Sequence, residues 1–340
     1  MPVSKEYLFK RTILLAFVVF GVIFITFMIT RVIPARPELL WAGPHATLEQ
    51  IEEARRQLHL DKHIYLQFIL YIQDLIFGNW GISWRTRAPI LSDIISSLTA
   101  TLELIIIAFI IAVMAGIPLG ILAAIKKHGW IDDVIRVLTV IGASVPVFWL
   151  ALIVQLAFGM WLGLLPSAKR VDEWVVITTS FKPITGFYII DSMLQGNLLV
   201  LVNSIQHIIL PAIVLAAYPL CLSARMTRAV MIEVLSEQHV RSLMAWGLPQ
   251  RLIFFKYCLK NTLAPLIASL GLSFGYMIIG AFMVELVFVW PGIGFYAAMS
   301  LLSFDYPAVT GCVIIVAIFY CIINTLIDII HSVIDPRVKL

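Results

Sequence analysis

The stretch LTATLELIIIAFIIAVMAGIPLGILAAI, from Leu98 to Ile125, holds a single ionisable residue, Glu103. About 20 consecutive apolar residues are enough for a helix to cross the hydrocarbon core of a bilayer. The whole chain of 340 residues is 61% hydrophobic and 13% charged, whereas a soluble domain has roughly 25% charged residues. The sequence therefore predicts an integral membrane protein.

Six apolar runs are long enough to span the membrane, which predicts an all-α polytopic fold with six transmembrane helices. The first run follows Lys5, Lys10 and Arg11. Its apolar core is longer than that of a signal peptide, so we expect an uncleaved first span. The runs cover residues 12–33, 98–125, 137–165, 205–224, 262–285 and 306–327.

Lysine and arginine predict the orientation, because these residues are retained on the cytoplasmic side of a membrane protein. With six spans, Lys10, Lys126, Arg228 and Lys256 all fall on one side. We therefore expect a multi-pass protein of the plasma membrane with both termini in the cytoplasm. Membrane lipid is its expected surrounding, and a net charge of +4 gives no reason to expect a nucleic-acid partner.

The chain divides into three predicted regions. Residues 1–33 form the cytoplasmic N-terminus and the first span, residues 34–97 an external helical subdomain, and residues 98–340 a core of five spans. In the subdomain, Thr47 and Gln50 have the spacing of a capping box and open a short helix. Residues 166–204 are a second external region, interpreted as an ordered loop and a docking surface.

Small residues and prolines recur inside the spans. Gly271, Gly275 and Gly280 allow close helix packing, with Ser273 on the same helix, and we expect these residues to serve packing or to line a pathway. A proline within a span is expected to kink or break its helix. These prolines are Pro118, Pro146, Pro211, Pro219 and Pro265.

A basic segment, about residues 229–261, lies between the fourth and fifth spans. Its apolar residues have helical spacing, Gly247 stands where a helix end needs a left-handed residue, and Pro249 can restart a helix. The pattern predicts a short helix, a sharp elbow and a second helix at the cytoplasmic surface. An ordinary amphipathic loop is the alternative, but the length and the elbow favour a protein partner.

This segment resembles the cytoplasmic EAA loop of ABC importer permeases, in the form found in dipeptide, oligopeptide and nickel permeases. HVRSLMAWGL from His239, followed by KNTLAP from Lys260, is similar to the two halves of that motif. Further segments resemble family motifs in the same order, so that the resemblance covers nearly the whole chain and fits the first of the two permease subunits better. They include LHLDKHIYLQF, GNWGISWRTRAPI, SVPVFWLAL, VELVFVWPGIG and DPRVKL.

The chain also departs from the family pattern. Arg241-Ser242-Leu243 stands where other importers have Glu-Ala-Ala, and Trp246 replaces a residue that is usually basic.

The resemblance implies the fold of a type I ABC importer permease that works by alternating access. Its implied partners are a second homologous permease, two ATPase subunits and an extracellular substrate-binding protein. ATP and Mg would be bound by the ATPases, since this chain has no phosphate-binding G-x-x-x-x-G-K-[ST] motif. No cofactor and no catalytic residue is expected in this chain. The residues implied to couple it to the ATPase are His239, Val240, Arg241, Ser242, Leu243, Met244, Ala245, Trp246, Gly247 and Leu248.

The family carries peptides or nickel, and some relatives carry oligosaccharides, so peptides are the expected substrate and the other two are alternatives. A second class of function is an ion-coupled transporter, which usually places ionisable residues at the bilayer midplane or has inverted repeats. We see no internal repeat in this sequence.

An intramembrane serine protease is a remoter alternative. Gly271-Leu272-Ser273-Phe274-Gly275 reads G-x-S-x-G, and His207 or His331 would have to act as the base. The simpler interpretation is a glycine packing face on which Ser273 bonds to its own helix.

Four further ionisable residues have weak alternative roles. His59 and His63 are four apart, but we expect them to be solvated rather than metal ligands, and no metal site is predicted. Glu103 and Glu285 lie just inside predicted spans, where a charge is often functional. We favour the interpretation that they lie at the outer interface or pack against the partner permease.

Overall fold

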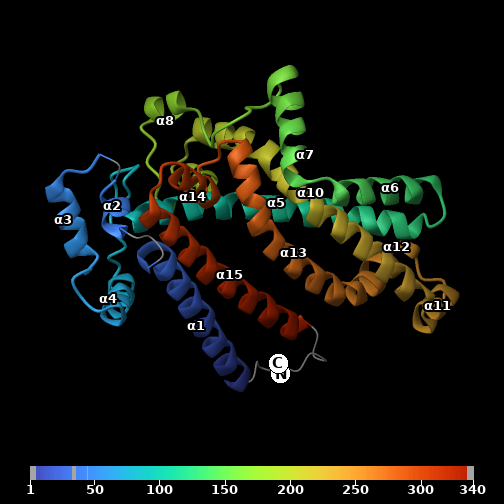
Figure 1. Cartoon of the computed structure of the whole chain (residues 1–340). Helices are drawn as coiled ribbons and strands as arrows, with labels where there is room; N and C mark the ends of the chain where they lie inside the picture. Colours follow the sequence, from blue (N-terminus) through green and yellow to red (C-terminus); the bar gives the residue numbers. More distant parts are fainter. Residues whose placement is uncertain (1–4, 33–35, 44, 335–340) are drawn as a thin grey trace. The chain divides into compact units, whose positions relative to one another are not determined.

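The structure is a computed structural model that describes residues 5–32, 36–43 and 45–334 (Figure 1). Within these residues the chain is built from helices, and the one β feature is an isolated bridge between Ile82 and Pro89. Five helices are long and apolar enough to cross a membrane, and a bent pair of helices makes a sixth candidate. The predicted all-α polytopic fold is confirmed.

The chain forms two compact units. Among the described residues, one holds Thr101–Trp290 and the chain from Asn324 onward, and the other holds those up to Ala100 together with Pro291–Ile323. This division follows packing, whereas the predicted boundaries at residues 33 and 97 follow the side of the membrane and stay predictions.

The first unit is a bundle of long helices with short helices at its two ends. Its elements are α5 (Ile90–Ile125, from Thr101), α6 (Trp130–Ser144), α7 (Val147–Val154), η2 (Gln155–Trp161), α8 (Glu173–Thr179), α9 (Tyr188–Leu194), α10 (Leu198–Ser236), α11 (Gln238–Ala245), α12 (Gln250–Leu252), η3 (Ile253–Cys258), α13 (Leu259–Val287) and the last turns of α15 (Tyr306–Ile334, from Asn324).

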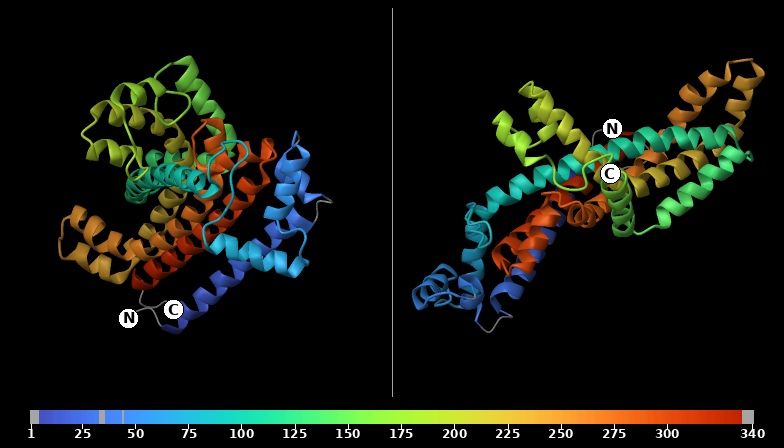
Figure 2. Two further views of the ribbon diagram at one scale, coloured as in Figure 1. Left: turned by 90° about the vertical axis from the view of Figure 1, so that its left-hand side faces the viewer. Right: turned by 90° about the horizontal axis from the view of Figure 1, so that it is seen from above.

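Close packing in this bundle rests on glycines of α5. A Cβ added to Gly120 would lie 2.5 Å from the carbonyl oxygen of Ala224 and 2.6 Å from Cβ of Thr227, both on α10. A Cβ on Gly116 would overlap the side chain of Ser223 on the same helix. The backbones of α5 and α10 can therefore approach only because these positions lack a side chain. On another side, α10 runs beside α13 (Figures 1 and 2).

The predicted third span, residues 137–165, is not one straight helix. The pair α6 and α7–η2 is bent by 105° at Val145 and Pro146. Pro146 precedes α7, where its missing N–H breaks no helical hydrogen bond. Helices α5, α10 and α13 continue through Pro118, through Pro211 and Pro219, and through Pro265. Of the five prolines, only Pro146 stands at a helix break.

The second unit has short helices packed around two longer ones. Thr47 and Gln50 form the predicted capping box at the start of α3, with both side chains accepting from the other residue's backbone N–H. A hydrophobic core joins Ile90 and Ile94 to Tyr296 and Cys312. The elements are α1 (Lys5–Phe27), η1 (Met28–Val32), α2 (Pro37–Ala42), α3 (Leu48–Gln57), α4 (Ile64–Ile76), the first turns of α5, α14 (Ile293–Leu302) and α15 (Tyr306–Ile334) up to Ile323.

Candidate functional site

The segment after α10 has a sharp elbow between two helices. Helix α11 ends at Ala245, and Gly247 has φ +77°, a left-handed conformation that glycine adopts without strain. The Gly247 N–H donates to the Met244 carbonyl at 3.0 Å, and the Leu248 N–H donates to the Leu243 carbonyl at 3.3 Å. This pair of hydrogen bonds is a Schellman motif, which satisfies the last carbonyls of the helix and reverses the chain direction.

One face of α11 anchors the elbow to the bundle. Val240 is fully buried against Met231 of α10, Ile121 of α5 and Ile253 of η3. Leu243 and Leu248 pack on the same cluster and are partly buried. These contacts fix how α11 lies on the end of α10 and α5.

The opposite face of the elbow is exposed. Met244 is 43% exposed and Trp246 is 77% exposed, large values for apolar side chains. The structure therefore divides the ten predicted coupling residues into an anchoring set, Val240, Leu243 and Leu248, and a surface set. The surface set is His239, Arg241, Ser242, Met244, Ala245, Trp246 and Gly247.

The elbow lies at one end of α10, and α8 and α9 lie at the other (Figure 1). The single helix α10 connects these two regions, since it follows α9 directly and leads into α11.

The predicted packing residues of α13 face neighbouring helices. A Cβ on Gly271 would overlap Ile327 of α15, and a Cβ on Gly280 would lie 3.3 Å from Leu215 of α10. Gly275 is buried. The Ser273 hydroxyl donates to the carbonyls of Leu270 at 2.9 Å and Ser269 at 3.1 Å, both in its own helix.

The predicted base of the protease alternative is engaged elsewhere. Nδ1 of His207 lies 2.8 Å from the Asn203 carbonyl, and its Nε2 lies 3.5 Å from Oδ1 of Asp172. The side chain of His331 lies outside the described residues. Neither Ser273 nor His207 has the arrangement of a nucleophile and its base, in which the two side chains bond to each other.

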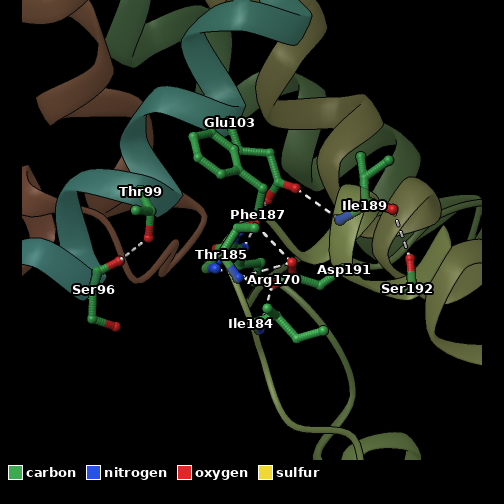
Figure 3. A network of polar contacts seen from close by, with 11 residues as sticks. Ser96, Thr99, Glu103, Arg170, Ile184, Thr185, Phe187, Ile189, Asp191 and Ser192 are labelled. Carbon is green, nitrogen blue, oxygen red and sulfur yellow. Dashed lines mark hydrogen bonds and ion pairs between the residues drawn. The ribbon is translucent and has the colours of Figure 1, made fainter. Parts of the chain in front are cut away.

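A buried ion pair joins α5 to the 166–204 segment. Glu103 and Arg170 have side chains only 5% and 6% exposed. Nε of Arg170 donates to Oε2 of Glu103 at 2.9 Å, and Nη2 of Arg170 also donates to this oxygen. The other carboxylate oxygen accepts from the Ile189 N–H at 2.9 Å (Figure 3).

Arg170 has further partners in the same segment. Its Nη2 donates to the Gly186 carbonyl at 2.7 Å, and its guanidinium lies 3.9 Å from the ring centre of Tyr188. A carboxylate, a carbonyl and an aromatic face thus engage Nε, Nη2 and the plane of this guanidinium. Arg170 is therefore the residue through which this segment is seated on α5.

Asp191, at the centre of the same segment, organises the loop before α9. Its carboxylate accepts from the backbone N–H groups of Ile184, Thr185 and Gly186 and from the Thr185 hydroxyl, all at 2.7 to 3.1 Å (Figure 3). Burial by itself would raise the pKa of this carboxyl, but these hydrogen bonds outweigh burial and hold the pKa below its ordinary value.

These contacts revise the interpretation of the acidic residues in the spans. Glu103 has its ionic partner, Arg170, inside the same chain, and Glu285 accepts from the Thr101 hydroxyl at 2.6 Å. Packing against a second permease is therefore not needed to satisfy either carboxylate. The sequence could not pair Glu103 with Arg170, because the two are 67 residues apart and only the folded loop brings them together.

A second ion pair was also missed in the sequence. Arg228 of α10 forms a two-pronged contact with Asp132 of α6, through Nε to Oδ1 at 2.5 Å and Nη2 to Oδ2 at 2.7 Å. From the sequence alone, Arg228 is only one of the basic residues that indicate the orientation. In the structure it ties α6 to α10.

The histidine pair is not arranged as a metal site. Helix α3 ends at Gln57 and α4 begins at Ile64, so His59 and His63 lie in the connection and not on one helix face. His59 has φ +55°, and His63 stacks on Tyr65. Among the described residues, no three His, Cys, Asp or Glu side chains gather as metal ligands do.

Comparison with known proteins gives matches along almost all of the chain. The family model "Binding-protein-dependent transport system inner membrane component" matches residues 116–340. The model of the N-terminal part of such membrane components matches residues 5–114.

Three relatives illustrate the similarity. The probable D,D-dipeptide transport system permease protein of Escherichia coli is 42% identical over 95% of this chain and 94% of its own length. A dipeptide transport system permease protein of Alkalihalophilus pseudofirmus is 37% identical over 98% of this chain and 99% of its own. The dipeptide transport system permease protein of Escherichia coli is 33% identical over 98% of both chains.

The described helices, the elbow after α10 and these matches agree along the length of the chain, from the N-terminal helices to α15. The chain belongs to the family of inner membrane components of binding-protein-dependent transport systems.

Proposed function

We propose that the chain is the transmembrane permease subunit of an ATP-driven importer of short peptides. The observation that carries this proposal is the similarity, at 33 to 42% identity and nearly full length, to permeases named for dipeptide transport. Nickel and oligosaccharides are the competing substrates, and no described residue cluster favours nickel.

The proposed assembly contains a second homologous permease, two ATPase subunits and an extracellular binding protein. Both termini and the elbow lie in the cytoplasm, as the distribution of lysine and arginine predicts. The exposed face of α11, with Arg241, Met244 and Trp246, sits in a groove of an ATPase subunit. An exposed tryptophan beside a methionine is a suitable anchor for such an interface.

Transport then follows from the connection of α11 to α10. ATP and Mg bind to the ATPase subunits, whose closure moves α11, and α11 moves α10 because Val240 is buried against Met231. The pathway opens outward to accept peptide from the binding protein, and hydrolysis resets it. This chain carries out no covalent chemistry.

Reconstitution tests the proposal. The purified assembly in proteoliposomes, with its binding protein outside and ATP inside, is expected to accumulate radiolabelled dialanine. Neither nickel nor maltotriose should reduce this uptake. Both the L,L and the D,D dipeptide are to be tested, since one relative is named for the D,D form. ATP-dependent accumulation of nickel or sugar without peptide accumulation would contradict the peptide assignment. Purification of the chain from its native membrane without any ATPase subunit would contradict the importer itself.

A further inference from the structure

The second unit contains a large cavity that the proposed transport mechanism does not use. Its volume is about 1080 Å³, and every residue that lines it belongs to this unit. Ligand cavities in proteins have volumes of roughly 300 to 1,000 Å³. The cavity is therefore large enough to hold a small organic molecule.

Successive turns of α3 supply one wall. Glu49, Glu53 and Gln57 are spaced by four residues, so they share one face of the helix, and all three line the cavity. The Gln57 amide donates to the Glu53 carboxylate at 3.3 Å. Asp74 of α4 adds a third carboxylate to the lining.

Aromatic rings supply a second wall. Trp41 and Trp84 line the cavity and pack edge to face, with ring centres 6.1 Å apart. Trp80 also lines it, and its indole N–H donates to the Leu75 carbonyl at 3.1 Å, which fixes the ring. Rigid indole rings beside carboxylates attract a cation that carries an apolar group.

Two arginines line the cavity, and they differ in whether they can contact a ligand. Arg31 is buried, donates to the Leu58 carbonyl at 3.1 Å and lies 5.0 Å from the ring centre of Tyr71. Arg87 is exposed and has φ +59°, a conformation that is uncommon for a residue with a side chain. Arg87 is thus the cation placed to meet a ligand, on a loop closed by the hydrogen bond from its N–H to the Ser83 carbonyl.

We propose that this cavity binds a short zwitterionic peptide, so that the permease holds a substrate site of its own besides that of the binding protein. The ammonium end lies against Glu49, Glu53 and Asp74, the carboxylate end is met by Arg87, and the indole rings contact the side chains. This inference rests on the peptide substrate proposed above. A neutral sugar would stack on the same rings but would gain little from three carboxylates and a guanidinium.

Direct binding to the full chain tests the proposal. The chain is purified in lipid nanodiscs with its accompanying subunits but without the binding protein, and titrated by calorimetry with alanylphenylalanine. Acetylation of the peptide's amino end and amidation of its carboxyl end should each weaken binding about tenfold, because each removes a charged hydrogen bond.

Matched variants locate the site. Glu53→Gln should weaken binding of the unmodified peptide about tenfold, and Glu52→Gln, an exposed neighbour outside the lining, should not. Arg87→Asn should have the same effect as amidation of the peptide, since asparagine tolerates the left-handed backbone at this position. Arg55→Gln is its control, because Arg55 is an exposed arginine of α3 that does not line the cavity.

The outcomes separate this inference from the proposed function. Peptide binding that is insensitive to Glu53→Gln and Arg87→Asn would overturn the cavity site, as would absence of binding or tighter binding of maltotriose. The uptake assay of the complete importer decides independently whether peptides are transported. Uptake without cavity binding leaves the importer standing and removes this site, whereas failure of both removes the peptide assignment.

Discussion

At the scale of single residues, Arg170 is the residue on which the seating of the 166–204 segment depends. Its guanidinium meets Glu103 of α5, the Gly186 carbonyl and the Tyr188 ring, and both charges of the pair are almost fully buried. Breaking a buried pair by removing one partner leaves the other charge unpaired in a dry environment.

We therefore expect Arg170→Gln to destabilise the protein by about 3 to 5 kcal/mol. Lys169→Gln, which removes the neighbouring exposed contact of Lys169 with Glu173, should have almost no effect. Thermal unfolding of the detergent-purified variants measures both. Equal melting temperatures for the two variants would contradict the structural role of the buried pair.

The hydrogen bonds of Asp191 indicate how the stability of this segment changes as the pH falls. Its pKa is held below the ordinary value by hydrogen bonds from Ile184, Thr185 and Gly186, so its ionised form stabilises the folded loop. This stability is fully present above the unfolded pKa near 3.9 and is lost as the pH falls through the lower folded pKa.

Asp191→Asn is expected to lower stability at pH 7 by roughly 2 kcal/mol, since hydrogen bonds to a charged acceptor are lost. It should also flatten the decrease in stability below pH 4. Melting temperatures recorded from pH 7 to pH 3 check this, and an acid profile that is the same in wild type and variant would show that another carboxylate is responsible.

At the scale of elements, α5 and α10 pack closely because glycines of α5 have no side chain at the contact. The space at Gly120 is too small for a methyl group, because Ala224 and Thr227 lie within 2.6 Å of the position it would occupy. Gly21 on α1, by contrast, has no neighbouring atom within 4 Å of that position.

Gly120→Ala is therefore expected to destabilise the protein by about 1 to 3 kcal/mol through overpacking. Gly21→Ala should be neutral or slightly stabilising, because alanine favours a helix more than glycine does. Expression and thermal unfolding of the pair give the comparison. A stable Gly120→Ala protein would mean that α5 and α10 separate at little cost.

The elbow after α11 yields an element-scale prediction about transport. Gly247 has open space around it, so its requirement for glycine comes only from φ +77°. Valine resists this conformation, whereas asparagine tolerates it. Gly247→Val should abolish peptide uptake while inserting normally, and Gly247→Asn should retain most of the uptake. Full uptake by Gly247→Val would show that the orientation of α11 does not couple this chain to the ATPase.

The elements that the sequence predicts correctly are those with a local signal. Apolar runs predict the long helices, Thr47 and Gln50 predict a capping box, and Gly247 followed by Pro249 predicts the elbow. What the sequence misses depends on contacts between distant residues. Glu103 with Arg170 and Asp132 with Arg228 pair residues 67 and 96 positions apart, for which no periodic pattern exists. The bend of 105° at Pro146 also exceeds what a proline alone implies.

The candidate site was only partly predictable for the same reason. A helical repeat shows which residues share a face but not which face meets the bundle, so the family resemblance gives one role to all ten residues from His239 to Leu248. Burial of Val240 against α10 and α5 separates the anchoring residues from the exposed ones.

At the scale of the whole molecule, orientation can be tested with single cysteines. Trp174 of α8 and Trp246 at the elbow are exposed, at 58% and 77%, on the two sides that we propose to face outside and inside. Three of the four native cysteines are buried, and only Cys321 needs replacement by serine. In intact cells a membrane-impermeant maleimide should label Trp174→Cys, and it should label Trp246→Cys only after permeabilisation. The reverse pattern would invert the topology.

The length of α10 has a mechanical consequence. Its 39 residues rise about 58 Å at 1.5 Å per residue, roughly twice the 30 Å of hydrocarbon in a bilayer. A force applied where α11 is anchored therefore reaches the far end through one continuous backbone, without a relay of side chains. Pro211 and Pro219 each remove one backbone hydrogen bond from this rod. Bending of α10 should therefore concentrate at these two residues, and it would reduce how much of a movement of α11 reaches the other end of the helix.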